Sequence, residues 1–353
     1  MHNFIKDYLA LTNSSNFIQF YKDLAFKLDV ILDKGQGEVK TVQDWVNLLN
    51  NENLNSKFGQ INFNTIFIHS FNRSQHGSHP SGIEFDSLLS PKYSSSKISK
   101  KEMGDIIFIT SFYDKQNKIL EKMTINQVKK TKDTAWNIDQ EQLYFLSRFP
   151  RFKGVVGSII PQKNYYLQDH SKALGSFGLM QNNNFTFLGA NRLLTVIGNK
   201  SSVKLNDFSL MNNFTPQPNF SLCLDDDFCY HLYKKFHRTI PYQYISSLNK
   251  LFNIEFSNLY SNSTFDFIEN YLKGYIGELI ACDEYKNIST NTEANRFLND
   301  ILSNLSQDIN NQVFLNNYGY AGRNNDNNPI NSFDFDEESG IAIIQVKITL
   351  EGN

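Results

Sequence analysis

The stretch GDIIFITSFYDKQNKILEKMTINQVKK, residues 104–130, indicates the fold more clearly than any other part of the chain. An apolar and β-branched run is followed by DKQNK (114–118), which has the composition of a turn, and then by a second run that alternates. This pattern is typical of two antiparallel strands joined by a short connection. We therefore predict a β-hairpin formed by residues 104–114 and 119–131.

Three polar side chains are expected to meet in this hairpin. Asp105 opens the first strand, and Gln127 and Lys129 lie two residues apart on the second. Side chains at positions i and i+2 of a strand point to the same face. The separation of 127 − 105 = 22 residues leaves room for two strands and a turn. We expect Asp105, Gln127 and Lys129 to converge at one end of the hairpin.

These residue types suit the chemistry of a divalent cation. Mg²⁺ prefers carboxylate, carbonyl and water oxygens, so Asp105 could supply the charge and Gln127 a neutral oxygen. Lys129 could orient a water and stabilise charge developing on a phosphate. A single carboxylate makes a weak site, and Glu84 and Glu102 are the candidates for a second acid. The predicted metal ligands are Asp105, Gln127 and Glu84, for Mg²⁺ or Mn²⁺.

The hairpin resembles the core of the PD-(D/E)xK superfamily, the restriction-endonuclease-like nucleases, and in particular its uncharacterised bacterial members. In that family an acid opens one strand, the next strand carries (D/E/Q)-x-K, and an early helix often adds a glutamate. Asp105 and Gln127-Val128-Lys129 match this order, and Glu84 or Glu102 is a weaker match to the accessory glutamate. The resemblance covers roughly residues 60–160, and Gln127 departs from the acidic form of the motif.

The resemblance implies an α/β protein with a restriction-endonuclease-like mixed sheet flanked by helices. It further implies a metal-dependent endonuclease that cleaves DNA, with bacterial defence as the setting and a homodimer where both strands are cut. Two alternatives stay open. One is a catalytically degenerate nuclease fold that binds nucleic acid or a protein, with Gln127 marking a lost site. The other is a subunit of a larger assembly.

A second, weaker Q-x-K pattern lies in FDFDEESGIAIIQVKITL (333–350). Asp336 precedes a turn, Gln345 and Lys347 flank Val346, and Glu278 lies upstream in a segment with helical spacing. A helical glutamate, an acid and Q-x-K are again in the family's order. We rank this group second because the segment before the strand is loop-like and offers no partner strand. We expect an edge strand here.

Composition limits the function classes. The 353 residues and 40% hydrophobic content are sufficient for two domains, which we predict as a nuclease-like domain over 1–200 and a mainly helical domain over 201–353 that ends in a strand. The net charge of −2 does not favour nucleic-acid binding but permits a local basic stripe. Three cysteines without a CxxC pair, and no apolar run of membrane-spanning length, indicate the cytoplasm and no membrane partner.

The remaining periodicities complete the expected elements. Helices are predicted over 4–33, 41–50, 139–149, 228–237, 243–252, 265–285 and 292–309, and strands over 61–71, 154–160, 185–190, 193–198 and 340–350. The helix over 41–50 is expected to start near Thr41 or Asp44. His69, His76 and His79 with Arg73 are interpreted as a polar loop beside a site.

Overall fold

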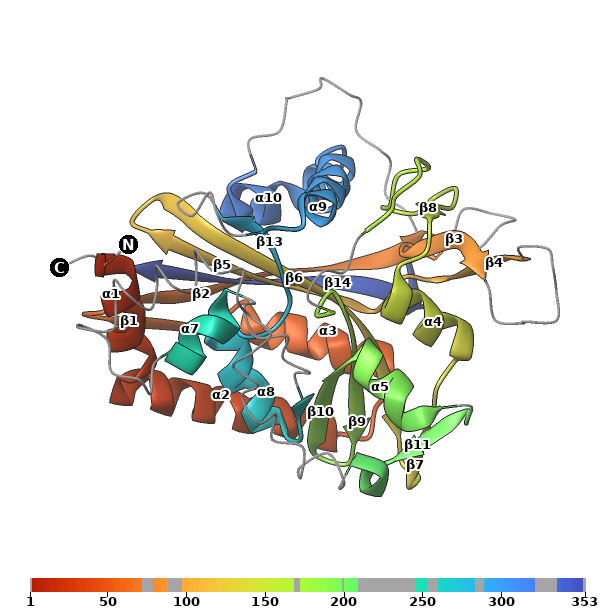
Figure 1. The fold of residues 1–353 in the computed structure, drawn as a ribbon, viewed down its shortest axis with the longest axis horizontal. Coiled ribbons are helices and arrows are strands. Elements are labelled where there is room, and N and C mark those ends of the chain that lie inside the picture. Colours follow the sequence, from red (N-terminus) through yellow and green to blue (C-terminus); the bar gives the residue numbers. More distant parts are fainter. Residues whose placement is uncertain are drawn as a thin grey trace, which may run out of the picture.

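The computed structural model describes residues 2–71, 79–87, 97–167, 172–198, 200–208, 245–252, 260–282, 289–320 and 335–351. Within them, the chain forms an α/β structure built on a nine-stranded mixed sheet (Figure 1). The strands are ordered β1-β2-β14-β5-β6-β9-β10-β12, and β13 pairs with β6. Their bounds are β1 (Asn53–Ser56), β2 (Gly59–Phe71), β5 (Ile106–Asp114), β6 (Asn117–Thr131), β9 (Gly175–Gln181), β10 (Asn184–Gly189), β12 (Tyr260–Ser261), β13 (Glu278–Cys282) and β14 (Phe335–Leu350).

Two hydrophobic cores lie on opposite faces of the sheet, because side chains alternate along each strand. On β5, Ile106 and Phe108 belong to one core, and Ile107 and Ile109 to the other. The first core is completed by α1 (His2–Thr12), α2 (Ser15–Asp33), α3 (Glu38–Leu49), α7 (Ile245–Leu251) and α8 (Thr264–Leu272). The second is completed by α4 (Gln140–Arg148), α5 (Ala190–Ile197), α9 (Thr292–Leu305) and α10 (Gln312–Tyr318), which follows the 3₁₀ turn Ile309–Asn311.

Two smaller sheets flank the main one. The three strands β4 (Lys97–Glu102), β3 (Gly82–Ser87) and β8 (Phe152–Gly154) pair in that order, and β7 (Ala135–Asn137) pairs with β11 (Ser202–Lys204). The small three-stranded sheet leads directly into the central hairpin, because only Met103, Gly104 and Asp105 separate β4 from β5. The position of this small sheet therefore restricts where β5 can begin.

The predicted hairpin is confirmed. β5 and β6 pair antiparallel from Ile106 opposite Asn126 to Asp114 opposite Asn117. After β6 the chain passes through α4 and returns as β9, which runs parallel to β6. α4 begins at the predicted place, because the Asp139 side chain caps it by accepting a hydrogen bond from Gln142 N. The hairpin, the crossover helix and the parallel strand form one continuous unit.

The C-terminal strand is central, and the prediction of an edge strand was wrong. β14 runs antiparallel to β2 on one side and parallel to β5 on the other. Its partner β2 is the predicted strand over 61–71, about 280 residues earlier in the chain. A partner at that distance cannot be recognised from the sequence next to β14, because the two strands share no local signal. The strands β12, β13 and β14 also carry the main sheet across the boundary predicted at residue 200.

Several element predictions are corrected. The helix over 4–33 is two helices, because Ser14 caps α2 through its hydroxyl. Residues 155–160 do not continue β8 as a strand. Of the strand predicted over 193–198, residues 193–197 belong to α5 and Gly198 is the C-cap of that helix. The helix over 265–285 ends at Leu272, and Gly274 and Gly277 then adopt positive φ before β13 begins. The helix over 228–237 lies outside the described residues. In the described part of the chain, no helix is long and apolar enough to cross a membrane.

The close contact between β9 and α4 yields a test of the fold. A Cβ atom at Gly175 would lie 1.9 Å from the backbone oxygen of Leu146 in α4. We expect Gly175→Ala to lower the free energy of unfolding by about 1–3 kcal/mol, because neither backbone can yield without displacing the helix. At Gly189 the nearest atom would be 3.6 Å away, so Gly189→Ala should cost less than about 1 kcal/mol. Urea unfolding measures the free energy of unfolding of both variants, and an equal decrease in the two would contradict this packing.

Candidate functional site

Asp105 is held at the start of β5 by both neighbouring strands. Its backbone N–H donates to Asn126 O on β6 at 2.9 Å, and its carbonyl accepts from Ala342 N on β14 at 2.8 Å. One carboxylate oxygen, Oδ2, accepts from Val128 N at 2.6 Å and from the Gln127 side chain. The other oxygen, Oδ1, receives no hydrogen bond from the described residues, so it is available to a ligand.

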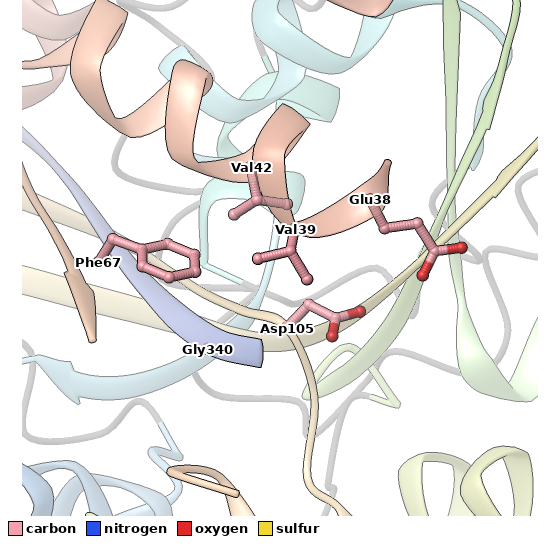
Figure 2. A pocket seen from close by; sticks show the side chains of 6 residues that line it. All are labelled: Glu38, Val39, Val42, Phe67, Asp105 and Gly340. Atoms are coloured by element: carbon pink, nitrogen blue, oxygen red, sulfur yellow. The ribbon is translucent and has the colours of Figure 1, made fainter. Parts of the chain in front are cut away.

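A small pocket opens beside this carboxyl group. It is lined by Asp105 together with Glu38, Val39, Val42, Phe67 and Gly340. Figure 2 shows the carboxylates of Asp105 and Glu38 on one side of the pocket and the side chains of Phe67 and Val42 on the other. Two acidic groups from distant parts of the sequence therefore share one opening, next to an apolar wall.

Glu38 is the first residue of α3, and the end of β6 fixes its position. Its Oε1 accepts from Lys130 N at 2.6 Å, and its other oxygen has no hydrogen bond with the described residues. The Lys130 ammonium group donates to Leu32 O at 3.2 Å and to Thr41 Oγ1 at 3.0 Å. This anchors the N-terminus of α3 on β6. A carboxylate in the first turn of a helix also complements the helix dipole.

The electrostatics of the site favour a positively charged ligand. Burial raises the pKa of Asp105 to about 7, and the charges of Glu102 and Glu38 raise it further, against the lowering effect of Lys129 and of the Val128 N–H. A carboxyl group that is difficult to ionise beside other acids lacks compensating positive charge. A cation placed between Asp105 and Glu38 would supply that charge.

Lys129 lies where the prediction put it, two residues after Gln127 on β6. Its side chain is partly buried, and its charge lowers the pKa of Asp105. Among the described residues its ammonium group forms no ion pair or hydrogen bond. The structure therefore brings Asp105, Gln127 and Lys129 to the same end of the hairpin.

Gln127 faces Asp105 with its nitrogen, which does not fit its predicted role as a metal ligand. Nε2 donates to Asp105 Oδ2, while Oε1 accepts a hydrogen bond from Gln142 on α4. An N–H group cannot coordinate a cation. Sequence alone does not indicate this orientation, because it predicts Gln142 only as part of the helix over 139–149.

The two predicted accessory acids lie elsewhere. Glu84 on β3 forms an ion pair with Lys153 at 2.7 Å and does not line the pocket, so its predicted role as a metal ligand is not supported. Glu102 is closer: its charge acts on Asp105, but its carboxylate lies 3.2 Å from His79 Nε2. Ser81 N donates to His79 Nδ1 at 3.2 Å, so the ring proton is on Nε2 and faces Glu102.

The acid that the sequence analysis missed is Glu38. We placed the start of its helix at Thr41 or Asp44, whereas α3 begins at Glu38 after the N-cap Gly37. The signal was present, since a glycine followed by an acid is a common helix start. Of the predicted polar loop, His76 and Arg73 lie outside the described residues.

The second Q-x-K pattern does not assemble the predicted site. Gln345 is fully buried and donates to Ser111 Oγ at 2.9 Å, and the Lys347 ammonium lies 4.5 Å from the centre of the Tyr113 ring. Glu278 begins β13 instead of lying on a helix, and β13 pairs with β6 and not with β14. Asp336 is in β14, but its side chain is outside the described part.

The acid connected to Gln345 is Glu121, through Ser111. Glu121 Oε1 accepts from Ser111 Oγ at 2.7 Å, from Tyr318 OH at 2.9 Å and from the Lys118 ammonium at 3.1 Å. Glu121 is 2% exposed. A buried carboxylate with this many donors has no position left for a ligand, so the network holds α10 on the sheet.

No group of three or more His, Cys, Asp or Glu side chains in the described ranges is arranged to hold a metal ion. The site at Asp105 offers two carboxylates. Comparison with protein-family models, with curated proteins and with solved structures finds no match to this chain.

The pKa of Asp105 predicts how stability depends on pH in the absence of cations. The folded-state value of about 7 exceeds the value near 3.9 in an unfolded chain. The contribution of Asp105 is therefore fully present below about pH 4 and is lost as the pH rises through 7. In EDTA, we expect Asp105→Asn to be more stable than the native protein by about 1–3 kcal/mol at pH 8 and nearly equal to it at pH 4. A difference that urea unfolding finds constant over this range would contradict the raised pKa.

Proposed function

We propose that this protein is a Mg²⁺-dependent nuclease of the restriction-endonuclease-like kind that cleaves DNA at the Asp105 site. The observation that carries the proposal is the pocket that Asp105 and Glu38 share. In each carboxylate one oxygen accepts a backbone hydrogen bond, and the other accepts none from the described residues. Lys129 adds a cation on the same strand end, close enough to affect the pKa of Asp105. Two acids could hold a divalent cation for phosphodiester cleavage, and a lysine could stabilise the negative charge on the phosphate.

The residues fit Mg²⁺ in number and type. Mg²⁺ keeps several of its waters and is commonly bound through one or two carboxylates together with substrate phosphates. Asp105 Oδ1 and the second oxygen of Glu38 would be the protein ligands. When bound, the cation would polarise a phosphate oxygen and ready a water for attack. Soft or nitrogen-rich ligands, which would favour zinc, are not part of this pocket.

Each side chain then has a separate task. Asp105 is oriented by β6 through Val128 N and Gln127, which leaves Oδ1 directed to the ligand. Glu38 is oriented by Lys130 N. Lys129 would stabilise the negative charge that develops on the phosphate, as an ammonium group in a partly buried position does effectively.

The order of elements supports the same proposal. A hairpin with an acid at the start of one strand and Q-x-K on the next, followed by a crossover helix and a parallel strand, resembles the core of the PD-(D/E)xK nucleases. Glu38 on an early helix occupies the place in the order that the accessory glutamate takes in that family. A homodimer and a role in bacterial defence belong to this proposal and rest on the resemblance. The cytoplasmic location that we also propose rests on the three cysteines without a CxxC pair.

One observation favours a second candidate function, a nucleic-acid-binding module that does not cut. The site has two acids where a third carboxylate is replaced by Gln127, and Gln127 presents a nitrogen to Asp105. Such a site would bind a cation weakly. Divalent-cation binding that depends on Asp105 separates the two candidates.

Cleavage of plasmid DNA with Mg²⁺ or Mn²⁺ is the direct test. We expect Asp105→Asn, Glu38→Gln and Lys129→Met each to lower the cleavage rate by about 10²-fold or more. The first two remove a proposed ligand of the cation, and the third removes the positive charge proposed to act on the phosphate. Single-stranded RNA under the same conditions should be cut poorly.

Two control variants locate the reaction. Glu84→Gln removes a carboxylate that is paired with Lys153, and Lys347→Met alters the second Q-x-K. Both should cleave at the native rate. Full activity in Asp105→Asn, or loss of activity only in Lys347→Met, would refute the proposed site. If RNA were cut better than DNA, the proposed substrate would be wrong while the proposed site would stand.

Cation binding can be measured without a substrate. We expect Mn²⁺, followed by electron paramagnetic resonance, to bind one site in the native protein, and the affinity to fall by about tenfold or more in both Asp105→Asn and Glu38→Gln. Glu84→Gln should bind as the native protein does. Binding that is unaffected by both substitutions would remove Glu38 and Asp105 as ligands and favour the non-cutting module.

A further inference from the structure

Gln142 has a side chain whose orientation is decided by its acceptors. It lies in the first turn of α4, is 5% exposed, and directs Nε2 to Glu102 O at 3.2 Å and to Gln127 Oε1. Both acceptors are oxygen atoms. Turning the Gln142 amide over would bring its own oxygen against Glu102 O and Gln127 Oε1. Both acceptors would lose their donor in a buried place, which is strongly unfavourable. The nitrogen of Gln142 therefore has to face Gln127.

Gln127 continues the same polarity. Its Oε1 receives the hydrogen bond from Gln142, and its Nε2 donates to Asp105 Oδ2 and to Val128 O at 3.2 Å. With Gln127 only 1% exposed, water cannot replace a lost partner. A reversed Gln127 amide would place its oxygen against two oxygens and its nitrogen against another nitrogen. Gln142 and Gln127 thus form a relay with a single direction, ending on Asp105.

We propose that Gln142 is a positioning residue for the cation site: acting through Gln127, it keeps Asp105 Oδ2 occupied by a donor and leaves Oδ1 as the oxygen for the ligand. This inference rests on the proposed function and adds to it. It assigns the glutamine of the Q-x-K motif as a hydrogen-bond donor, so the cation is held by two carboxylates and not by the amide oxygen.

The helix that carries Gln142 is fixed on its polar side by the small three-stranded sheet. Asp139 caps α4 by accepting from Gln142 N at 2.9 Å and is bound by the Lys101 ammonium at 2.6 Å. Glu141 accepts from Ser99 Oγ at 2.9 Å. Because β4 holds the start of the helix in two places, the relay has little freedom to relax by moving the backbone.

Reversing the relay tests the inference. Gln142→Glu introduces a carboxylate that can only accept, so the Gln127 amide must turn over to donate to it. Gln127 Oε1 then faces Asp105 Oδ2, and a cation bound beside these two oxygens would offset their repulsion. We expect the melting temperature in EDTA to fall by several degrees, and the affinity for Mn²⁺ to rise by about tenfold. The rise in affinity is a change that a purely structural role would not produce.

Two further variants isolate the effect. Gln140→Glu makes the same substitution on the same helix, where the side chain donates to Lys200 O at an exposed position away from the site. It should leave the Mn²⁺ affinity unchanged and lower the melting temperature less than Gln142→Glu does, because water can replace the lost partner. Combining Gln127→Leu with Gln142→Glu should abolish the gain in Mn²⁺ affinity, because the turned amide is then absent. A gain that survives in the double variant would overturn the inference.

Gln142→Met provides a measurement that does not depend on cation binding. It removes the donor without adding a charge. In EDTA we therefore expect the native protein to have the highest melting temperature, Gln142→Met a lower one and Gln142→Glu the lowest. A relay of opposite polarity would make Gln142→Glu the more stable of the two variants, and that order would overturn the inference.

If Gln142→Glu does not fold, Mn²⁺ should bind Gln142→Met a few times more tightly than the native protein, and unchanged binding would overturn the inference. Absence of Mn²⁺ binding by every form refutes the metal site of the proposed function, while the order of melting temperatures still decides the relay.

Discussion

β14 is inserted between β2 and β5 and joins the N-terminal strands to the central hairpin in one sheet. This strand pairs with β2 from Phe335 to Leu350 and with β5 from Ala342 to Leu350. Without it, the N-terminal strands and the central hairpin would have unpaired edges. The same ladder reaches the candidate site, because Ala342 N donates to the carbonyl of Asp105. The C-terminal strand β14 thus helps to hold Asp105, which comes from the N-terminal half of the chain.

The two Q-x-K segments show how neighbours decide the role of a motif. Gln127 lies at the end of a strand, beside an acid that has one oxygen open to a pocket. Gln345 lies in the middle of the sheet, where Glu121 is already bound by Ser111, Lys118 and Tyr318. A carboxylate whose lone pairs are used stabilises packing, while one that is incompletely compensated can bind a ligand. The position along the strand, and not the motif, makes the difference.

Local chemistry made part of this structure predictable from sequence. The hairpin, the start of α4 at Asp139 and the convergence of Asp105 with Gln127 follow from strand alternation, turn composition and a capping side chain, all of which act within about twenty residues. The pairing of β14 with β2, and the meeting of Glu38 with Asp105, could not be predicted in the same way because the partners lie far apart along the chain. Gly37 and Glu38 did mark the start of α3 locally. The boundary between α8 and β13 was missed because an apolar run of that length suits either element until glycines with positive φ are recognised.

A crystal structure of the protein with Mn²⁺ shows directly whether a divalent cation is bound between Asp105 and Glu38. Anomalous scattering at the manganese edge identifies the ion without relying on shape. The account predicts one peak in the pocket, within about 2.2 Å of Asp105 Oδ1 and of one Glu38 oxygen, with the Gln127 nitrogen still turned toward Asp105 Oδ2. A pocket without a peak, or a peak coordinated by other residues, would contradict the claim.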